Sequence, residues 1–358
     1  MNSTKALHDV GQSLWLDNIT RELLNGGVLR RYIDELSVTG LTSNPTIFDH
    51  AISKSADYDA DIATKREKKA EDLFFDLALA DITRAADLFL PIYKRTGGVD
   101  GWVSLEVSPL LANDTENTLA AAQDLHQRAA RPNLFIKIPG TPAGLPAIEE
   151  AIFAGIPVNV TLLFSCAQYV AAAEAYLRGI ERRVAAGLNP SVGSVASLFI
   201  SRWDVAVAGK VGADLTNQLG IAVAKQTYHA YQDLLSSARF QRLANEGAHA
   251  QRLLYASTGT KDPKASDTLY IQALAAPYTV NTMPENTLLA FTDHGKVTGA
   301  LTPDGGDYQS VLENFKKAGV DLDALALKLQ QEGADSFVKS WDDLIGCIEA
   351  KLTELRKG

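Results

Sequence analysis

Eight short apolar segments alternate with helical segments along this chain, and this alternation limits the possible folds more than any other feature. Each segment is a few residues long and is followed by residues with helical periodicity. That order is typical of parallel strands joined by right-handed crossovers. The expected strands are Ser13 to Ile19, Thr39 to Pro45, Gly101 to Pro109, Asn133 to Thr141, Ile156 to Leu163, Ser194 to Asp204, Leu253 to Gly259 and Tyr278 to Met283.

Eight such units predict an α/β fold, a single closed (β/α)8 TIM barrel with its active site at the carboxyl ends of the strands. The alternative is an open doubly wound sheet, but no GxGxxG or Walker-type sequence follows any strand. Residues 1–358 are predicted to form one domain, because no Pro/Ser linker or low-complexity tract divides them. Extra helices are expected between strands two and three, within Thr46 to Arg95, and in a C-terminal extension from about residue 307.

The C-terminal extension carries an apolar stripe at helical spacing, which predicts a helix with one buried face. We expect it to pack on the outside of the barrel or partly over its mouth, and a partner-binding helix is the other possibility. The stripe consists of Phe337, Trp341, Leu344, Ile345, Ile348, Leu352 and Leu355.

Charge and composition argue against several classes of partner. The chain has 34 Lys and Arg against 43 Asp and Glu, a formal charge of -9, and no basic block with interleaved aromatics, so nucleic acid is not expected. Neither a signal peptide nor an apolar window of about 18 residues is found, which predicts a cytoplasmic protein without a membrane partner. Two cysteines without a CxxC, and six histidines without HxH or HExxH spacing, give little support to a metal site.

Lys137 is the most unusual residue of the expected strands, because it interrupts the apolar run NLFIKIPGT. A buried ammonium without a partner is costly, so such a group tends to lose its proton. A neutral amine at a strand end is a nucleophile that forms a Schiff base with a sugar carbonyl. The structural alternatives are a snorkelling lysine and one half of an ion pair.

Other strands also place polar side chains near their carboxyl ends, on the parity opposite to the aliphatic residues. In a barrel the inward parity converges on one axis, which predicts a shared site. Each residue alone has a structural alternative: a helix N-cap for Asp17, a turn residue for Asn44 and a surface carboxylate for Glu106. The set comprises Asp17, Asn44, Glu106, Lys137, Asn159, Thr161 and Ser197.

This set suits the chemistry of a polyhydroxylated carbonyl compound. Carboxylates shuttle the protons that an amine nucleophile needs, and amides and hydroxyls hold sugar hydroxyls. Arg202, just past strand six, and Lys261, in the loop STGTK, would together grip a phosphate. The structural alternative for Lys261 is a solvated loop charge.

Five stretches resemble the transaldolases, which are Schiff-base aldolases. They occur in the family's order, and the resemblance extends from about Asp17 to the C-terminal helices. It implies a (β/α)8 barrel that acts in the non-oxidative pentose phosphate pathway. The insert from Ser53 to Gly98 and the long tail resemble a longer bacterial subgroup. The five stretches are LTSNPTIF, SLEVSP, LFIKIPGT, NVTLLFS and SLFISRWD.

The resemblance assigns catalytic roles to four positions. Lys137 matches the Schiff-base lysine. Glu106 matches the acid–base carboxylate, which acts through a water that Thr161 helps to hold. Asp17 matches the aspartate that takes the proton from the C4 hydroxyl during C3–C4 cleavage.

Further positions match substrate-binding residues. Asn44 and Asn159 match asparagines that hold hydroxyls of the dihydroxyacetone unit, and Ser197 matches the serine beside the C1 end. Arg202 matches the phosphate-binding arginine. Phe199 stands where transaldolases carry phenylalanine and fructose-6-phosphate aldolases carry tyrosine, which favours transfer over simple cleavage. The family often has SFR where this chain reads STGTK, so Lys261 is assigned by its loop alone.

The implied reaction transfers a dihydroxyacetone unit from sedoheptulose 7-phosphate or fructose 6-phosphate to glyceraldehyde 3-phosphate or erythrose 4-phosphate. No metal or organic cofactor is expected, because the iminium is the electron sink. The expected partners are phosphorylated sugars, and the expected state is a monomer or homodimer. Two alternatives stay open: a fructose-6-phosphate aldolase-like lyase, and a non-catalytic sugar-phosphate binding barrel in which Lys137 is structurally paired.

Overall fold

The computed structural model describes residues 3–357, with the side chains of residues 3–354. Its parallel strands pair in chain order and close into one barrel, which confirms the predicted (β/α)8 fold. The strands are β1 (Ser13–Asp17), β2 (Val38–Thr42), β3 (Val103–Glu106), β4 (Leu134–Pro139), β5 (Val158–Leu163), β6 (Ser194–Phe199), β7 (Gln251–Ala256) and β8 (Val280–Met283).

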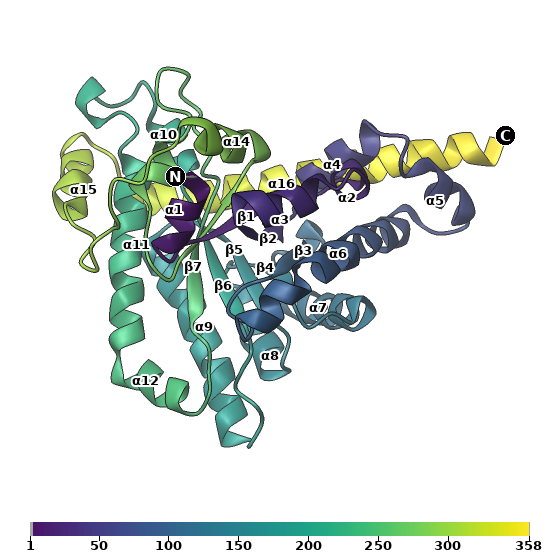
Figure 1. Cartoon of the computed structure of the whole chain (residues 1–358), viewed down its shortest axis with the longest axis horizontal. Coiled ribbons are helices and arrows are strands. Elements are labelled where there is room, and N and C mark those ends of the chain that lie inside the picture. Colours follow the sequence, from purple (N-terminus) through teal and green to yellow (C-terminus); the bar gives the residue numbers. More distant parts are fainter. Residues whose placement is uncertain (1–2, 358) are drawn as a thin grey trace.

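Helices surround this barrel and cover its ends (Figure 1). Those that precede β6 in the chain are α1 (Ser3–Asp9), α2 (Arg21–Asn25), α3 (Val28–Leu36), α4 (Pro45–Ser53), α5 (Asp59–Thr64), α6 (Ala70–Arg95), η1 (Pro109–Leu111), α7 (Thr115–Ala129), α8 (Gly144–Phe153) and α9 (Cys166–Ala185). The later ones are α10 (Ser201–Val207), η2 (Ala213–Leu215), α11 (Leu219–Ser236), α12 (Ala238–Asn245), α13 (Leu269–Ala273), α14 (Glu285–His294), α15 (Tyr308–Lys317) and α16 (Leu322–Lys357).

Two boundaries differ from the sequence-based expectation. The residues from Thr20 to Ser37 have the periodicity of a single helix, but the segment is divided into α2 and α3, because Gly27 takes φ +72°, outside helical backbone. The sixth strand ends at Phe199 and not at Asp204, since α10 begins at Ser201. A short apolar run such as this one does not distinguish a strand from a buried helix turn.

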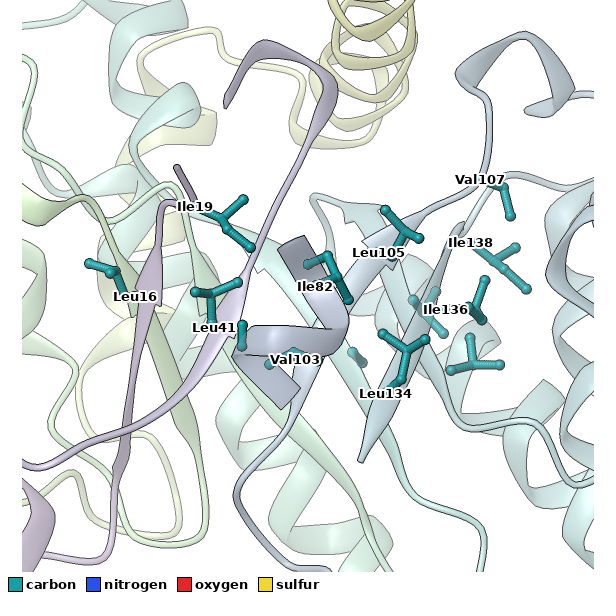
Figure 2. Packing of buried hydrophobic residues seen from close by; sticks show 14 of the residues in the cluster. Leu16, Ile19, Leu41, Ile82, Val103, Leu105, Val107, Leu134, Ile136 and Ile138 are labelled. Carbon is teal, nitrogen blue, oxygen red and sulfur yellow. The ribbon is translucent and has the colours of Figure 1, made fainter. Parts of the chain in front are cut away.

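Aliphatic side chains on the outer faces of the strands pack against the surrounding helices. Leu105 on β3 and Ile136 on β4 are buried in one cluster with Ile82 of α6, and Figure 2 shows these three close together. This layer follows the alternation that the sequence predicted, because Val103, Leu105 and Val107 all belong to it. Burial of this surface is the main favourable term for the barrel.

Aromatic rings fill the interior of the barrel towards the amino ends of the strands. Trp102, which precedes β3, stacks on Phe135 of β4 with centroids 4.0 Å apart, and Trp15 of β1 lies 6.1 Å from Phe135. Gly40 on β2 makes room for Trp15, because a Cβ there would lie 2.6 Å from the indole. The polar inward residues therefore lie on the carboxyl side of a packed layer of aromatic rings.

The C-terminal helix α16 runs across the molecule, and Figure 1 shows it spanning nearly the whole width of the view. The predicted stripe faces the protein: its residues are buried from Phe337 to Leu352, except for Ile345, which is half-buried. The side chain of Leu355 lies outside the described residues. Trp341 packs edge-on against Phe74 of α6, so the stripe covers this chain's own helices.

Candidate active site

Lys137 lies on β4 inside the barrel, with 5% of its surface exposed. Its Nζ is 3.0 Å from Oε2 of Glu106 and donates a 2.9 Å hydrogen bond to the carbonyl oxygen of Ser43, just past β2. The contact with Glu106 follows from the fold, because Glu106 and Lys137 are register partners on neighbouring strands. A buried amine thus lies beside a buried carboxylate, so Lys137 does form the ion pair that was one of its possible interpretations.

Glu106 is also buried, and apart from its ion pair with Lys137 neither carboxylate oxygen has a hydrogen-bond partner among the described residues. Burial raises the pKa of Glu106, and the positive charge of Lys137 opposes that rise. A carboxylate with unused lone pairs and a raised pKa is suited to accepting and returning protons. The surface-carboxylate interpretation is wrong for this residue.

Asp17 ends β1 and faces the same cavity as Lys137. Its Oδ1 accepts a 2.7 Å hydrogen bond from Thr42 on β2, and the Thr42 hydroxyl lies 2.6 Å from that of Thr282 on β8. Burial raises the pKa of Asp17, and Lys137 opposes this as it does for Glu106. The helix-cap interpretation fails, because Thr20 caps the following helix.

Asn159 on β5 lies behind the cavity wall, fully buried, and organises its neighbours. It donates to Ser104 Oγ at 3.1 Å and accepts from Ser197 Oγ at 2.7 Å. Thr161 lies two residues further along β5, lines the cavity and has a buried hydroxyl without a partner among the described residues.

Asn44 serves two purposes. Its Oδ1 accepts a 3.0 Å hydrogen bond from the backbone nitrogen of Ile47 and so caps α4, as the turn interpretation expected. Its amide nitrogen makes no hydrogen bond with the described residues, and the residue lines the cavity. The amide nitrogen is therefore free to donate to a bound hydroxyl.

Cationic side chains lie at the outer end of the cavity. The guanidinium of Arg202 lies 5.2 Å from the ring of Phe199 but has no hydrogen bond or ion pair among the described residues. Burial lowers its pKa, against the opposing charge of Glu332. Lys261 is exposed, lines the same cavity and is likewise unpaired within the described part of the chain. Two unpaired cations at one rim are suited to a phosphate.

The helix α16 crosses the carboxyl ends of the strands and closes part of this cavity. Gln330 donates to the carbonyl oxygens of Gly140 and Leu162, which follow β4 and lie on β5. Gly333 allows the close approach, because a Cβ there would lie 3.0 Å from Leu162. Phe337 reaches inward, with its ring centroid 5.9 Å from Lys137 Nζ. The expectation that the tail lies partly over the mouth is correct.

The resulting cavity has a volume of about 250 Å³. Glu106 and Asn159 do not line it but contact residues that do. Sequence reasoning did not assign Thr42, Thr282 or Phe337 to the site, although all three line it. The predicted site residues on its wall are Asp17, Asn44, Lys137, Thr161, Ser197, Phe199, Arg202 and Lys261.

A larger cavity, of about 390 Å³, lies at the amino ends of the strands. Asp100 there accepts hydrogen bonds from Ser13, from Trp15 at 2.9 Å and from a backbone nitrogen. Arg252 donates to Ser13 and to the carbonyl oxygens of Val99 and Thr279. The charged groups at this end are thus bonded to the protein itself.

Within residues 3–357, no group of three His, Cys, Asp or Glu side chains is arranged to hold a metal ion. No helix between Ser3 and Lys357 combines the length and apolarity needed to cross a membrane. Cys166 and Cys347 are both free.

Comparison with known proteins matches residues 14–348 to the family described as Transaldolase/Fructose-6-phosphate aldolase. A protein described as "Transaldolase" from Saccharopolyspora erythraea is 43% identical, with 99% of each chain covered. A protein described as "Transaldolase" from Mycobacterium ulcerans is also 43% identical, with 98% of each chain covered. Another so described, from Thiobacillus denitrificans, is 43% identical, and the match covers 97% of this chain and 100% of the relative. A solved putative fructose-1,6-biphosphate aldolase from Coccidioides immitis is 12% identical, covers 90% of this chain and 96% of its own, and has a TM-score of only 0.32.

Proposed function

The chain belongs to the transaldolase/fructose-6-phosphate aldolase family as an enzyme of the transaldolase type, and we propose that it works through a Schiff base on Lys137. The donor would be sedoheptulose 7-phosphate or fructose 6-phosphate. The acceptor would be glyceraldehyde 3-phosphate or erythrose 4-phosphate, as in the non-oxidative pentose phosphate pathway.

One observation carries this proposal: the buried amine of Lys137 lies 3.0 Å from a buried carboxylate that has no other partner among the described residues. Transfer of a proton from the ammonium to Glu106 leaves an amine with a free electron pair, and burial, which raises the pKa of Glu106, helps this carboxylate to accept the proton. The amine then attacks C2 of the donor: the C2–N bond forms, the π bond of the carbonyl breaks, and a proton moves from the nitrogen to the oxygen to give a C2 hydroxyl. Glu106 returns a proton to the C2 hydroxyl, which leaves as water, and the iminium remains.

Glu106 does not line the cavity, so its protons need a relay. The unpartnered hydroxyl of Thr161 supports the role that the resemblance gives it, to hold a water between Glu106 and the substrate. Hydroxyl and carboxylate can bind such a water from two sides. Loss of either group is expected to slow the dehydration of the carbinolamine.

Asp17 is suited to the cleavage step. Its carboxylate is oriented by Thr42 and its raised pKa makes it a stronger base than an exposed aspartate. It takes the proton of the C4 hydroxyl, the C4 oxygen forms a carbonyl, and the C3–C4 bond breaks. The electron pair moves to C3 and the iminium, giving an enamine that later adds to the acceptor aldehyde.

The remaining residues would hold the sugar phosphate. Asn44 has a free amide nitrogen for a hydroxyl, while the hydrogen bond from Ser197 to Asn159 fixes both side chains beside the amine. Arg202 and Lys261 would bind the phosphate at the cavity rim. These assignments keep the reacting carbons near Lys137 and the phosphate at the outer end.

The test is intact-mass analysis after incubation with fructose 6-phosphate and reduction with borohydride. We expect a dihydroxyacetone adduct on the wild type that erythrose 4-phosphate discharges before reduction. Lys137→Ala is the matched variant and should carry no adduct. A wild type without an adduct would contradict the proposal, and an adduct that the aldehyde does not discharge would favour the lyase alternative.

A further inference from the structure

We propose that Phe337 of α16 shields the enamine on Lys137 from water, and so favours transfer of the dihydroxyacetone unit over its release. The inference rests on the proposed Schiff-base function and adds a residue that controls the fate of its intermediate. Phe337 is 5% exposed, lines the cavity, and places its ring centroid 5.9 Å from the lysine nitrogen.

The chemistry of the cavity wall gives this ring its role. Polar groups surround the amine on the other sides, including Asp17, Thr161 and Ser197, and each of them can hold water. Phe337 offers neither a donor nor a strong acceptor, so water beside it loses hydrogen bonds. Its face also stabilises a nearby cation, such as the iminium.

Two fates compete for the enamine. In transfer, C3 attacks the acceptor aldehyde and a new C3–C4 bond forms. In release, C3 takes a proton from water, hydroxide adds to C2, the C2–N bond breaks and dihydroxyacetone departs from the restored amine. Both fates later need water to hydrolyse an iminium at C2, but only release needs water to protonate C3 of the enamine. Exclusion of water from the enamine therefore acts selectively on release.

The ring is held firmly enough to act as a wall. Gln330, two turns before Phe337, bonds two backbone carbonyl oxygens at the strand ends. One turn after Phe337, the hydroxyl of Ser340 lies 2.7 Å from that of Thr46, and Trp341 packs on Phe74. These contacts lie on both sides of Phe337, so its position is fixed by the whole helix.

The experiment measures the rate of dihydroxyacetone release from fructose 6-phosphate without acceptor, divided by the rate of transfer to erythrose 4-phosphate. Phe337→Ala is expected to raise this ratio about tenfold, and Phe337→Leu, which keeps an apolar wall, to raise it less. After the donor is removed, the amount of adduct that borohydride can still trap should also fall faster with time in Phe337→Ala. Leu344→Ala is the control, since Leu344 is buried on the same helix but does not line the cavity.

The outcomes separate this inference from the proposed function. If the wild type forms an adduct and transfers it, the proposed function stands whatever Phe337 does. A ratio within twofold of wild type in Phe337→Ala, or an equal rise in Leu344→Ala, would overturn the role of Phe337. If Phe337→Ala does not fold, the same ratio in Phe337→Leu decides.

Discussion

The two ends of the barrel differ in how their charged groups are bonded. At the amino end, Arg252 donates to a hydroxyl and to backbone carbonyl oxygens, and Asp100 accepts from three donors. At the carboxyl end, Arg202 has no hydrogen bond among the described residues, and the oxygens of Glu106 have no partner there beyond the ion pair with Lys137. The amino end has the larger cavity, yet the carboxyl end has the groups available to a ligand.

This difference separates two uses of buried charge. A charge whose hydrogen bonds are satisfied within the protein stabilises the fold, and its removal leaves its partners unsatisfied. A charge left without such partners costs stability but can bind or react. Of these two cavities, the larger is not the one whose charged groups are available to a ligand, and we propose the active site at the carboxyl end.

The largest contrast is expected between two buried carboxylates. Glu106→Gln should lower kcat roughly 10²–10⁴-fold, because it removes an acid–base group. Asp100→Asn should leave kcat within a few-fold of wild type while lowering the free energy of unfolding, because Asp100 only bonds its neighbours. Steady-state kinetics and urea unfolding check both variants, and similar losses of kcat in the two would break the comparison.

Glu106 also predicts a pH dependence. Burial raises the pKa of this group, so protonation should begin to lower kcat/KM at a pH above the ordinary range of a carboxyl group. The fall in kcat/KM would reflect both carboxylates of the site, since burial raises the pKa of Asp17 in the same way and the two groups titrate together. A profile that is flat down to the ordinary carboxyl range would contradict this.

Asp204 tests whether position or bonding decides the use of a charge. It follows Arg202 by two residues on α10, but it accepts from Tyr270 and from two backbone nitrogens of α11, as Asp100 accepts from its neighbours at the other end. Burial raises its pKa from 3.8 to about 6. Between these values the folded protein binds the proton more tightly than the unfolded chain, so the free energy of unfolding falls as pH rises, by roughly 3 kcal/mol in total.

Asp204→Asn should lose that pH-dependent component while kcat stays within a few-fold of wild type. Urea unfolding of both proteins between pH 4 and 7 measures the pH dependence of the free energy of unfolding, and the two proteins should differ by about the amount given above. Parallel stability curves would show that Asp204 does not titrate in this window. A large loss of kcat would show that Asp204 acts in the reaction although it is bonded within the protein, and would contradict the comparison.

The two arginines give the next contrast. Arg202→Ala should lower kcat/KM about 10–100-fold through KM, the worth of charge-assisted hydrogen bonds to phosphate, with little loss of stability. Arg252→Ala should leave kcat/KM unchanged and lower the free energy of unfolding by about 1–3 kcal/mol. Inorganic phosphate as a competitive inhibitor gives an independent reading, since it should bind more weakly only to Arg202→Ala.

Lys261 should give the smallest effect. Its side chain is exposed, so removal in Lys261→Ala should raise KM only by a factor of about two to five, and the effect should fade with added salt. KM measured at low and high ionic strength checks this. A loss of kcat/KM as large as that of Arg202→Ala would show that Lys261 and Arg202 contribute equally to phosphate binding.

Much of the site followed from strand alternation alone. The alternation placed Glu106 and Lys137 on the inward parity of consecutive strands, and the barrel makes such residues register partners. The resemblance to the family added roles that alternation could not supply, and those roles remain predictions. The single-domain assignment and the oligomeric state also remain predictions.

What the sequence could not give depends on contacts between distant segments. Thr42 and Thr282 reach Asp17 only because β1 lies between β2 and β8 in the closed barrel. Phe337 was recognised as part of an apolar stripe, but periodicity does not say which surface a helix crosses. Asn44 has two uses at once, and a cap signal in the sequence reveals only one of them.

The crossing of α16 also bears on how the protein is made. The strands that carry Asp17, Glu106 and Lys137 all precede α16 in the chain, so ribosomal synthesis completes the barrel segments first. During that interval the reactive amine has its partners but not the aromatic wall of Phe337. With the role proposed for Phe337, docking of α16 gives the barrel its selectivity only after the strands that carry the site have been made.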